Sequence, residues 1–193
     1  LFKFRHYFIS NMLVTRCLYQ YSLSIFYTRY SLYKTDLSLT IYQLLSPKNI
    51  LLDLEVEYKF DAINALVDTF VDDIGNEILE EIRKAIISRE KIMSTGVGQG
   101  LAIPHGKTDS VTQNYVAFAR LKEPIEFNSI DSKPVQLIFL MVSPYSDQRS
   151  HIRLLSKVST LMNYHDFRSD LLIVPNQEDL VELFRQKEYH QFN

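Results

Sequence analysis

The feature that most constrains the fold is an eight-residue run, 135–142, in which every residue except Gln136 is apolar. Pro144 follows the run and ends it. Because the side chains of a β-strand alternate between two faces, a strand that is apolar on both faces must be covered on both. The run therefore predicts a central strand of a sheet, with further layers packed on each side of it.

The rest of the chain alternates between strand-like and helical patterns. Short apolar runs predict further strands at 49–54, 101–103 and 115–119. Apolar residues at helical spacing predict helices at 61–75, 77–88, 147–163, 166–173 and 177–186. We expect Asp61 to cap the first of these helices and Gly75 to end it, and Asp147 to cap the third. This alternation predicts an α/β fold with helices layered against a sheet.

Composition limits the classes of function. The 193 residues are 46% hydrophobic and 23% charged, which is typical of a globular protein. The formal net charge of −2 argues against nucleic acid as a partner, because nucleic-acid binders usually carry a basic stripe. The single cysteine, Cys17, excludes an intrachain disulfide and a cysteine metal cluster, and it favours a cytoplasmic protein. No apolar run approaches the roughly 18 residues of a membrane span.

The first thirty-six residues differ in composition from the rest. They hold ten of the twenty-four Phe and Tyr residues, and five Lys or Arg against one acid, Asp36. We therefore divide the chain into a basic, aromatic leader, 1–36, outside the fold, and one domain, 37–193. Two alternatives stay open for the leader: an organellar transit peptide, which such a composition resembles, and an additional helix of the fold.

The stretch 96–108, GVGQGLAIPHGKT, carries the strongest indication of function. It is not a nucleotide site. A P-loop needs a glycine five residues before Gly106, where Leu101 stands, and the dinucleotide fingerprint has another glycine spacing and opens a helix. The glycines instead predict tight turns. Pro104 stiffens the backbone before His105 and Gly106 leaves room after it, which suits an imidazole that another molecule approaches.

A lone histidine is more often structural than catalytic, so His105 needs partners. His151 begins the apolar stripe of the helix after Asp147, near a helix N-terminus that favours an anion, although a buried ring bonded to backbone explains it equally well. Arg89 ends the second helix, where surface arginines are common, yet the loop after it could bring its phosphate-matching guanidinium beside His105. Neutral imidazole is nucleophilic and has an ordinary pKa of about 6.5. Together these residues predict a reversible phosphohistidine site that needs no metal and no cofactor.

Three motifs resemble those of one known family, the phosphotransferase-system (PTS) IIA domains of the fructose, mannitol and nitrogen-regulatory class, also called EIIA type 2. They are SRE at 88–90, STGVGQGLAIPHGK at 94–107 and SHIRLLS at 150–156. The resemblance runs from residue 39 to about residue 187, and the leader has no counterpart in it. Gln99 stands where the family often has Asn, and Ile152 where Leu is usual.

The resemblance implies an α/β/α sandwich with a mixed sheet flanked by helices. It also implies a phosphocarrier: His105 would accept the phosphate from the histidine phosphocarrier HPr or its nitrogen-branch counterpart. By the same resemblance, His151 would hydrogen-bond the phosphoryl group and aid its transfer, and Arg89 would bind its oxygens.

The destination of the phosphate stays open between two alternatives. A nitrogen-regulatory IIA protein would bind target proteins according to its phosphorylation state, whereas a sugar-transport IIA component would pass the phosphate to the cysteine of a IIB domain. We expect the regulatory role for two reasons. No IIB or membrane part is fused to the sequence, and residues 94–96 have the sequence Ser-Thr-Gly. A binding module with an inactive site is a third alternative, against which the presence of both histidines and the arginine argues.

Overall fold

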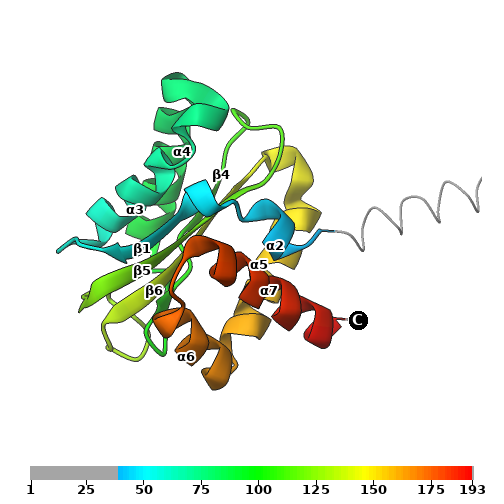
Figure 1. Ribbon diagram of the computed structural model, residues 1–193. Helices are drawn as coiled ribbons and strands as arrows, with labels where there is room; N and C mark the ends of the chain where they lie inside the picture. Colours follow the sequence, from blue (N-terminus) through cyan, green and yellow to red (C-terminus); the bar gives the residue numbers. More distant parts are fainter. Residues whose placement is uncertain (1–38, 193) are drawn as a thin grey trace, which may run out of the picture. The chain divides into compact units, whose positions relative to one another are not determined.

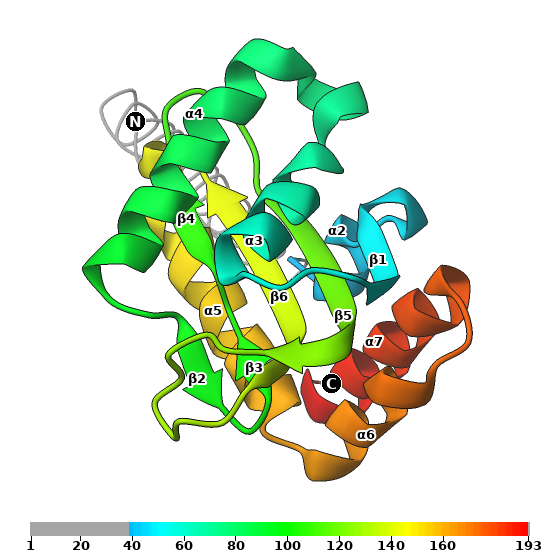
Figure 2. The ribbon, with the colours of Figure 1, turned by 90° about the vertical axis from the view of Figure 1, so that its left-hand side faces the viewer.

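The apolar run 135–142 forms strand β6 (Val135–Ser143), which lies in the middle of a mixed sheet. The computed structural model describes residues 39–192. Every residue of β6 except Gln136 is buried, as the pattern of the run predicted. β5 (Tyr115–Ile125) pairs with β6 along one side, and helices pack on both faces of the sheet (Figures 1 and 2).

The sheet has the strand order β1-β5-β6-β3-β2, and β4 also pairs with β6. The bounds of the remaining strands are β1 (Ile50–Leu54), β2 (Gly96–Gly98), β3 (Leu101–Ala102) and β4 (His105–Lys107). β3 and β4 both run parallel to β6 and keep one register along it, with Ala102 opposite Ile138 and His105 opposite Met141. They are therefore one strand that is interrupted at Pro104, which has no N–H to donate to the ladder.

Two layers of helices cover the sheet. One face carries α3 (Lys59–Asp68) and α4 (Val71–Ile92), which stand in front of the sheet in Figure 2. The helices of the other layer are α2 (Ile41–Leu44), α5 (Gln148–Met162), α6 (His165–Ile173) and α7 (Gln177–Phe192). Two short 3-10 helices are η1 (Pro47–Asn49) and η2 (Tyr145–Asp147). The predicted α/β/α sandwich with a mixed sheet is confirmed.

The predicted bounds of the first long helix are wrong. α3 begins at Lys59 after Tyr58 and ends at Asp68, so Asp61 lies in its first turn instead of capping it. An acid in that turn is favourable to the helix dipole, which is why the same residue type indicated a start two residues late. Gly75 does not end this helix but kinks α4, where its φ of 73° breaks the helical backbone. After the kink α4 continues beyond the predicted end, to Ile92.

The predictions for the second half of the chain agree better with the structure. Asp147 caps α5, because its carboxylate accepts a hydrogen bond of 3.1 Å from the Ser150 amide. α6 begins one residue before the prediction, and α7 extends to Phe192 instead of ending near residue 186. The leader, 1–36, lies outside the described residues, so its exclusion from the fold stays a prediction.

Both faces of the sheet are sealed by large side chains. On one face a continuous core joins α3 and α4 to the strands, with fully buried members that include Leu66, Phe70, Ile82, Ile86 and Val142. On the other face the ring of Phe184 from α7 meets those of Phe118, Phe139 and Phe167 at centroid distances of 6.1, 5.9 and 5.1 Å. The sheet is therefore a rigid support for the residues at its β4 end.

Candidate active site

His105 begins β4, immediately after the break at Pro104. The Nδ1 atom of its half-buried ring lies 2.8 Å from the carbonyl oxygen of Ile103. A carbonyl oxygen can only accept a hydrogen bond, so Nδ1 must carry the ring proton when the imidazole is neutral. The other nitrogen, Nε2, then keeps its lone pair. The local backbone thus leaves the neutral ring of His105 with an unprotonated Nε2, the atom through which an imidazole can act as a nucleophile.

Gly106 lets helix α4 lie directly against strand β4. A Cβ atom at this position would stand 3.0 Å from the Ile86 amide nitrogen and 3.1 Å from the carbonyl carbon of Ala85. The sequence analysis explained this glycine by room for an approaching molecule, whereas the structure shows that the space is filled by the helix backbone. The close approach also holds the last turn of α4 beside His105.

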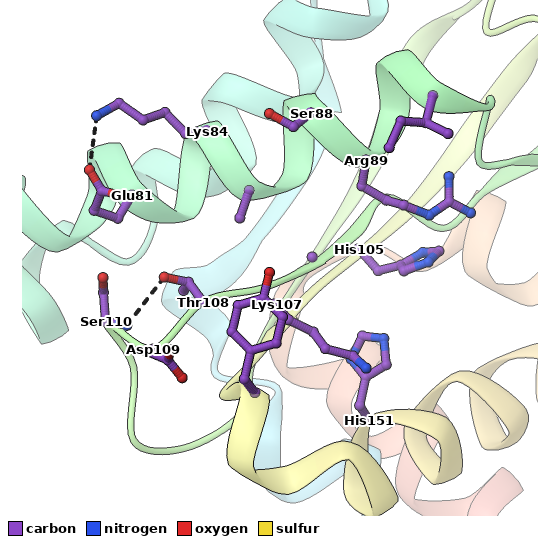
Figure 3. A pocket seen from close by; sticks show the side chains of 14 residues that line it. Glu81, Lys84, Ser88, Arg89, His105, Lys107, Thr108, Asp109, Ser110 and His151 are labelled. Atoms are coloured by element: carbon purple, nitrogen blue, oxygen red, sulfur yellow. Dashed lines mark hydrogen bonds and ion pairs between the residues drawn. The ribbon is translucent and has the colours of Figure 1, made fainter.

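That last turn carries Arg89, whose side chain enters the same pocket as His105 (Figure 3). Its Nη1 donates a hydrogen bond of 2.8 Å to the Met93 carbonyl. The neighbouring Glu90 is buried, pairs with Lys59 at 2.8 Å, and accepts hydrogen bonds from the amide and hydroxyl of Thr95. This carboxylate ties the chain beyond α4 to the end of the helix. The return of the chain that the sequence analysis considered for Arg89 is therefore present.

The turn between β2 and β3 uses the glycines as predicted. Gly98, Gln99 and Gly100 all have positive φ, of 92°, 56° and 76°. Gly96 serves a different purpose, since a Cβ atom there would lie 2.8 Å from the Ser129 Cα. The loop is thus a compact connection that leads the chain into β3.

His151 reaches the pocket from the opposite layer, as the fourth residue of α5. Its ring is 5% exposed, and its centroid lies 5.7 Å from that of His105 with an interplanar angle of 56°. Its Nδ1 atom is 3.0 Å from the hydroxyl oxygen of Ser143. The N-terminus of α5 differs in one respect from the expected anion site. The Ser150 amide already donates a hydrogen bond to the Asp147 carboxylate, so it is not available to an anion.

Both imidazoles are biased toward the neutral form. Burial lowers the pKa of His105; the hydrogen bond to Ile103 opposes this, and the cations of Arg89 and Lys107 add to it. Burial is also the largest cause that lowers the pKa of His151 to about 4, followed by the charges of Lys107 and His105. Two neutral imidazoles beside two cations suit a site that receives an anionic group.

The comparisons with known proteins agree with this geometry. The family model described as "Phosphoenolpyruvate-dependent sugar phosphotransferase system, EIIA 2" matches residues 43–187. The chain belongs to this family. As an EIIA domain it is a phosphotransfer component, and the family that the motifs resembled is confirmed.

Relatives of this EIIA domain carry names from two branches. It is 33% identical over 147 residues to the PTS system fructose-specific EIIABC component of Bacillus subtilis, covering 76% of this chain but only 23% of that protein. It is 35% identical over 132 residues to the nitrogen regulatory protein of Bradyrhizobium diazoefficiens, covering 68% of this chain and 85% of the relative. The crystal structure of nitrogen regulatory protein IIA-Ntr from Neisseria meningitidis matches with a TM-score of 0.70 and 32% identity, over 75% of this chain and 98% of that one.

The sequence analysis gave no role to Lys107, although its side chain also lines the pocket of the EIIA domain (Figure 3). Lys107 follows His105 by two residues on β4, and its charge lowers the pKa of both histidines. The signal was present in the sequence, because residues two apart in a strand face the same side. It was missed because Gly106-Lys107-Thr108 was weighed only as the end of a P-loop.

The pocket is open to solvent and is lined by both polar and apolar side chains. Two of its large lining side chains, Ile92 at the end of α4 and Tyr145 in η2, are 81% and 61% exposed. Within residues 39–192, no group of three or more His, Cys, Asp or Glu side chains could hold a metal ion. No helix of the same segment is long and apolar enough to cross a bilayer.

Proposed function

We propose that this EIIA domain carries a phosphoryl group on Nε2 of His105 and receives it from a phosphohistidine carrier of the HPr type. The observation that carries the proposal is the 2.8 Å hydrogen bond between Nδ1 of His105 and the Ile103 carbonyl. It presents the unprotonated Nε2 to a pocket that also holds Arg89 and Lys107.

The transfer step follows from this arrangement. The Nε2 lone pair attacks the phosphorus of the carrier's phosphohistidine, a new N–P bond forms, and the N–P bond to the carrier breaks. The electron pair of the broken bond returns to the carrier's imidazole. His105 keeps its proton on Nδ1, so the phosphorylated ring is cationic and its charge faces the Ile103 carbonyl. Because the phosphorylated ring is cationic, it leaves as a neutral imidazole when the N–P bond breaks, which keeps the bond labile, as a reversible carrier requires.

The other pocket residues act on the phosphoryl oxygens. A guanidinium has five N–H groups, so the bond from Arg89 to Met93 leaves others to bind oxygens in a fork. Lys107 supplies a second, compact positive charge on the His105 side of the pocket. His151 contributes a neutral ring on the opposite side, 5.7 Å from His105 between centroids. Arg89, Lys107 and His151 would thus together stabilise the negative charge that spreads over the phosphoryl oxygens in the transition state.

The partners follow from the open pocket. An open pocket in which the exposed side chains of Ile92 and Tyr145 stand beside charged residues is suited to a protein surface that brings its own phosphohistidine or acceptor. We propose the HPr-type or nitrogen-branch carrier as the donor, with a cytoplasmic setting in which these partners meet. The downstream partner is either a IIB domain that accepts the phosphate or a regulated target protein that binds one phosphorylation state of the chain.

We favour the nitrogen-regulatory role over sugar transport. It is supported by the 35% identity to the Bradyrhizobium nitrogen regulatory protein and by the likeness to the Neisseria IIA-Ntr structure. Fructose-type sugar transport is the second candidate, supported by the longer match to the Bacillus fructose component, over 76% of this chain.

One experiment tests both parts of the proposal. The chain is incubated with phosphoenolpyruvate, the first enzyme of the system and an HPr-type or nitrogen-branch carrier, and then mixed with a fructose-type IIB domain. We expect phosphate on the EIIA chain that stays there, with a regulated target binding only one phosphorylation state. Rapid transfer to the IIB cysteine would support sugar transport instead, and a chain that takes up no phosphate would contradict both roles.

A further inference from the structure

Ser143 stands at the end of β6 with a hydroxyl that the proposed chemistry has not used. Its side chain is fully buried, and it lies opposite Lys107 in the β4–β6 register. Its backbone carbonyl accepts a hydrogen bond from the Thr108 amide at 3.1 Å, so the backbone around the hydroxyl is fixed. The Oγ atom is 3.0 Å from Nδ1 of His151.

The direction of this hydrogen bond decides where His151 carries its proton. A hydroxyl has one proton, which needs an acceptor when it is buried. Among the residues that the structure describes, Nδ1 of His151 is the acceptor within hydrogen-bond distance of Oγ. If Nδ1 donated instead, the hydroxyl proton would be buried without a partner, which is costly. The Ser143 hydroxyl therefore donates to Nδ1, and the proton of the neutral ring goes to Nε2.

We propose that Ser143 is a positioning residue that holds His151 in the Nε2–H tautomer, so that the ring donates a hydrogen bond into the pocket. The two nitrogens of an imidazole point to opposite sides of the ring, so Nε2 faces away from Ser143. The value of this donor for transfer rests on the proposed function, whereas the tautomer itself does not.

The two histidines of the pocket are thereby given complementary tautomers by different partners. The Ile103 carbonyl, which only accepts, leaves His105 with a lone pair on Nε2. The Ser143 hydroxyl, which donates, leaves His151 with a proton on Nε2. One ring can attack a phosphorus atom, and the other can bond an oxygen of the same group. With the opposite tautomer, His151 would present a lone pair to the anionic oxygens and repel them.

Nuclear magnetic resonance on the full chain labelled with 15N-histidine tests the tautomer directly, near neutral pH and without any phosphate. We expect the ring proton on Nε2 of His151 and on Nδ1 of His105. A proton on Nδ1 of His151 would overturn the proposal, whatever a phosphorylation assay shows. The Ser143→Ala variant should shift the His151 ring toward Nδ1–H, and Ser143→Thr, which keeps the hydroxyl, should restore Nε2–H.

Kinetics separate a positioning role from a merely structural one. Ser143→Ala should slow phosphoryl transfer about tenfold, since one net hydrogen bond is worth roughly that factor. The same substitution in a His151→Ala background should have no further effect. An equal slowing in both backgrounds would overturn the proposal. Ser129→Ala is the matched control, because Ser129 is also buried but its hydroxyl has no hydrogen-bond partner among the described residues, and this variant should leave the His151 tautomer unchanged.

Discussion

The rings of His105 and His151 lie 5.7 Å apart between centroids, although they belong to opposite layers of the fold. His105 belongs to β4 and pairs with Met141 of β6. His151 belongs to α5 and contacts Ser143 at the end of β6. β6 therefore fixes both rings at once. We therefore expect a phosphoryl group on His105 to lie within reach of His151 without a rearrangement of the fold.

The first prediction concerns the supporting ring. His151→Ala should fold and still accept phosphate on His105, but transfer in both directions should slow about a hundredfold, as the loss of one preorganised donor usually does. Rapid-quench kinetics with a phosphorylated carrier measure the rates. His165→Ala is the control, because its side chain is 83% exposed and lies outside the pocket. Parental rates in His151→Ala would return His151 to a purely structural role.

Lys107 gives the second prediction. Because its positive charge lowers the pKa of both imidazoles, Lys107→Met should raise both pKa values part of the way toward the ordinary value, while burial, the larger cause, still holds them below it. Transfer should slow as well, since one cation leaves the phosphoryl oxygens. Histidine titration followed by NMR measures the pKa values. Lys122→Met removes an exposed lysine that pairs with Glu55 away from the pocket and should change neither pKa. Unchanged titration in Lys107→Met would contradict the pocket electrostatics.

Gly106 gives the third prediction. In Gly106→Ala the new methyl group meets the backbone of α4 at 3.0 Å, so the helix must move away from β4. We expect a loss of about 1–3 kcal/mol in the free energy of unfolding, which is typical of overpacking. Phosphate uptake should fall more than this loss of stability explains, because Arg89 moves with the helix. Denaturant unfolding and uptake kinetics, compared with those of the parental chain, give the two values; a variant as stable as the parent would show that the close contact is not needed.

The fourth prediction is a dependence of stability on pH. The pKa of His151 is about 4 in the folded state, below the ordinary value of about 6.5 expected when the chain is unfolded. As the pH falls from 6.5 to 4, the unfolded chain binds this proton first, so the folded state loses stability across that window. His151→Gln removes the group and should lose less. The difference between the two unfolding free energies should change by at most about 1.4 kcal/mol per pH unit, in favour of the variant. A constant difference would contradict the lowered pKa.

The sequence was sufficient for features that depend on local pattern. The apolar run 135–142 predicted the central strand, because burial on both faces leaves no other explanation for it. Asp147 was predicted correctly as a cap, because its side chain bonds only to the amide of Ser150, three residues further along the same helix. The bounds of α3 failed for a tertiary reason. Phe70 is fully buried at the junction where α3 ends and α4 begins, and this junction contains no glycine or proline that would mark it in the sequence.

The candidate site was predictable in part. Both histidines and Arg89 were identified by residue type and motif, and the structure brings all three into one pocket. Lys107 could have been found from the two-residue period of a strand. Ser143 could not, because its bond to His151 depends on how α5 packs on the end of β6. Sequence gives no measure of that distance.

The central claim is tested most directly by locating the phosphate. The chain is phosphorylated through phosphoenolpyruvate, the first enzyme and the carrier, and the modified nitrogen is identified by phosphorus–nitrogen NMR correlation. We predict one acid-labile, alkali-stable phosphate on Nε2 of His105, and none in His105→Ala. Phosphate on Nδ1 of His105, or label that persists in His105→Ala, would contradict the account.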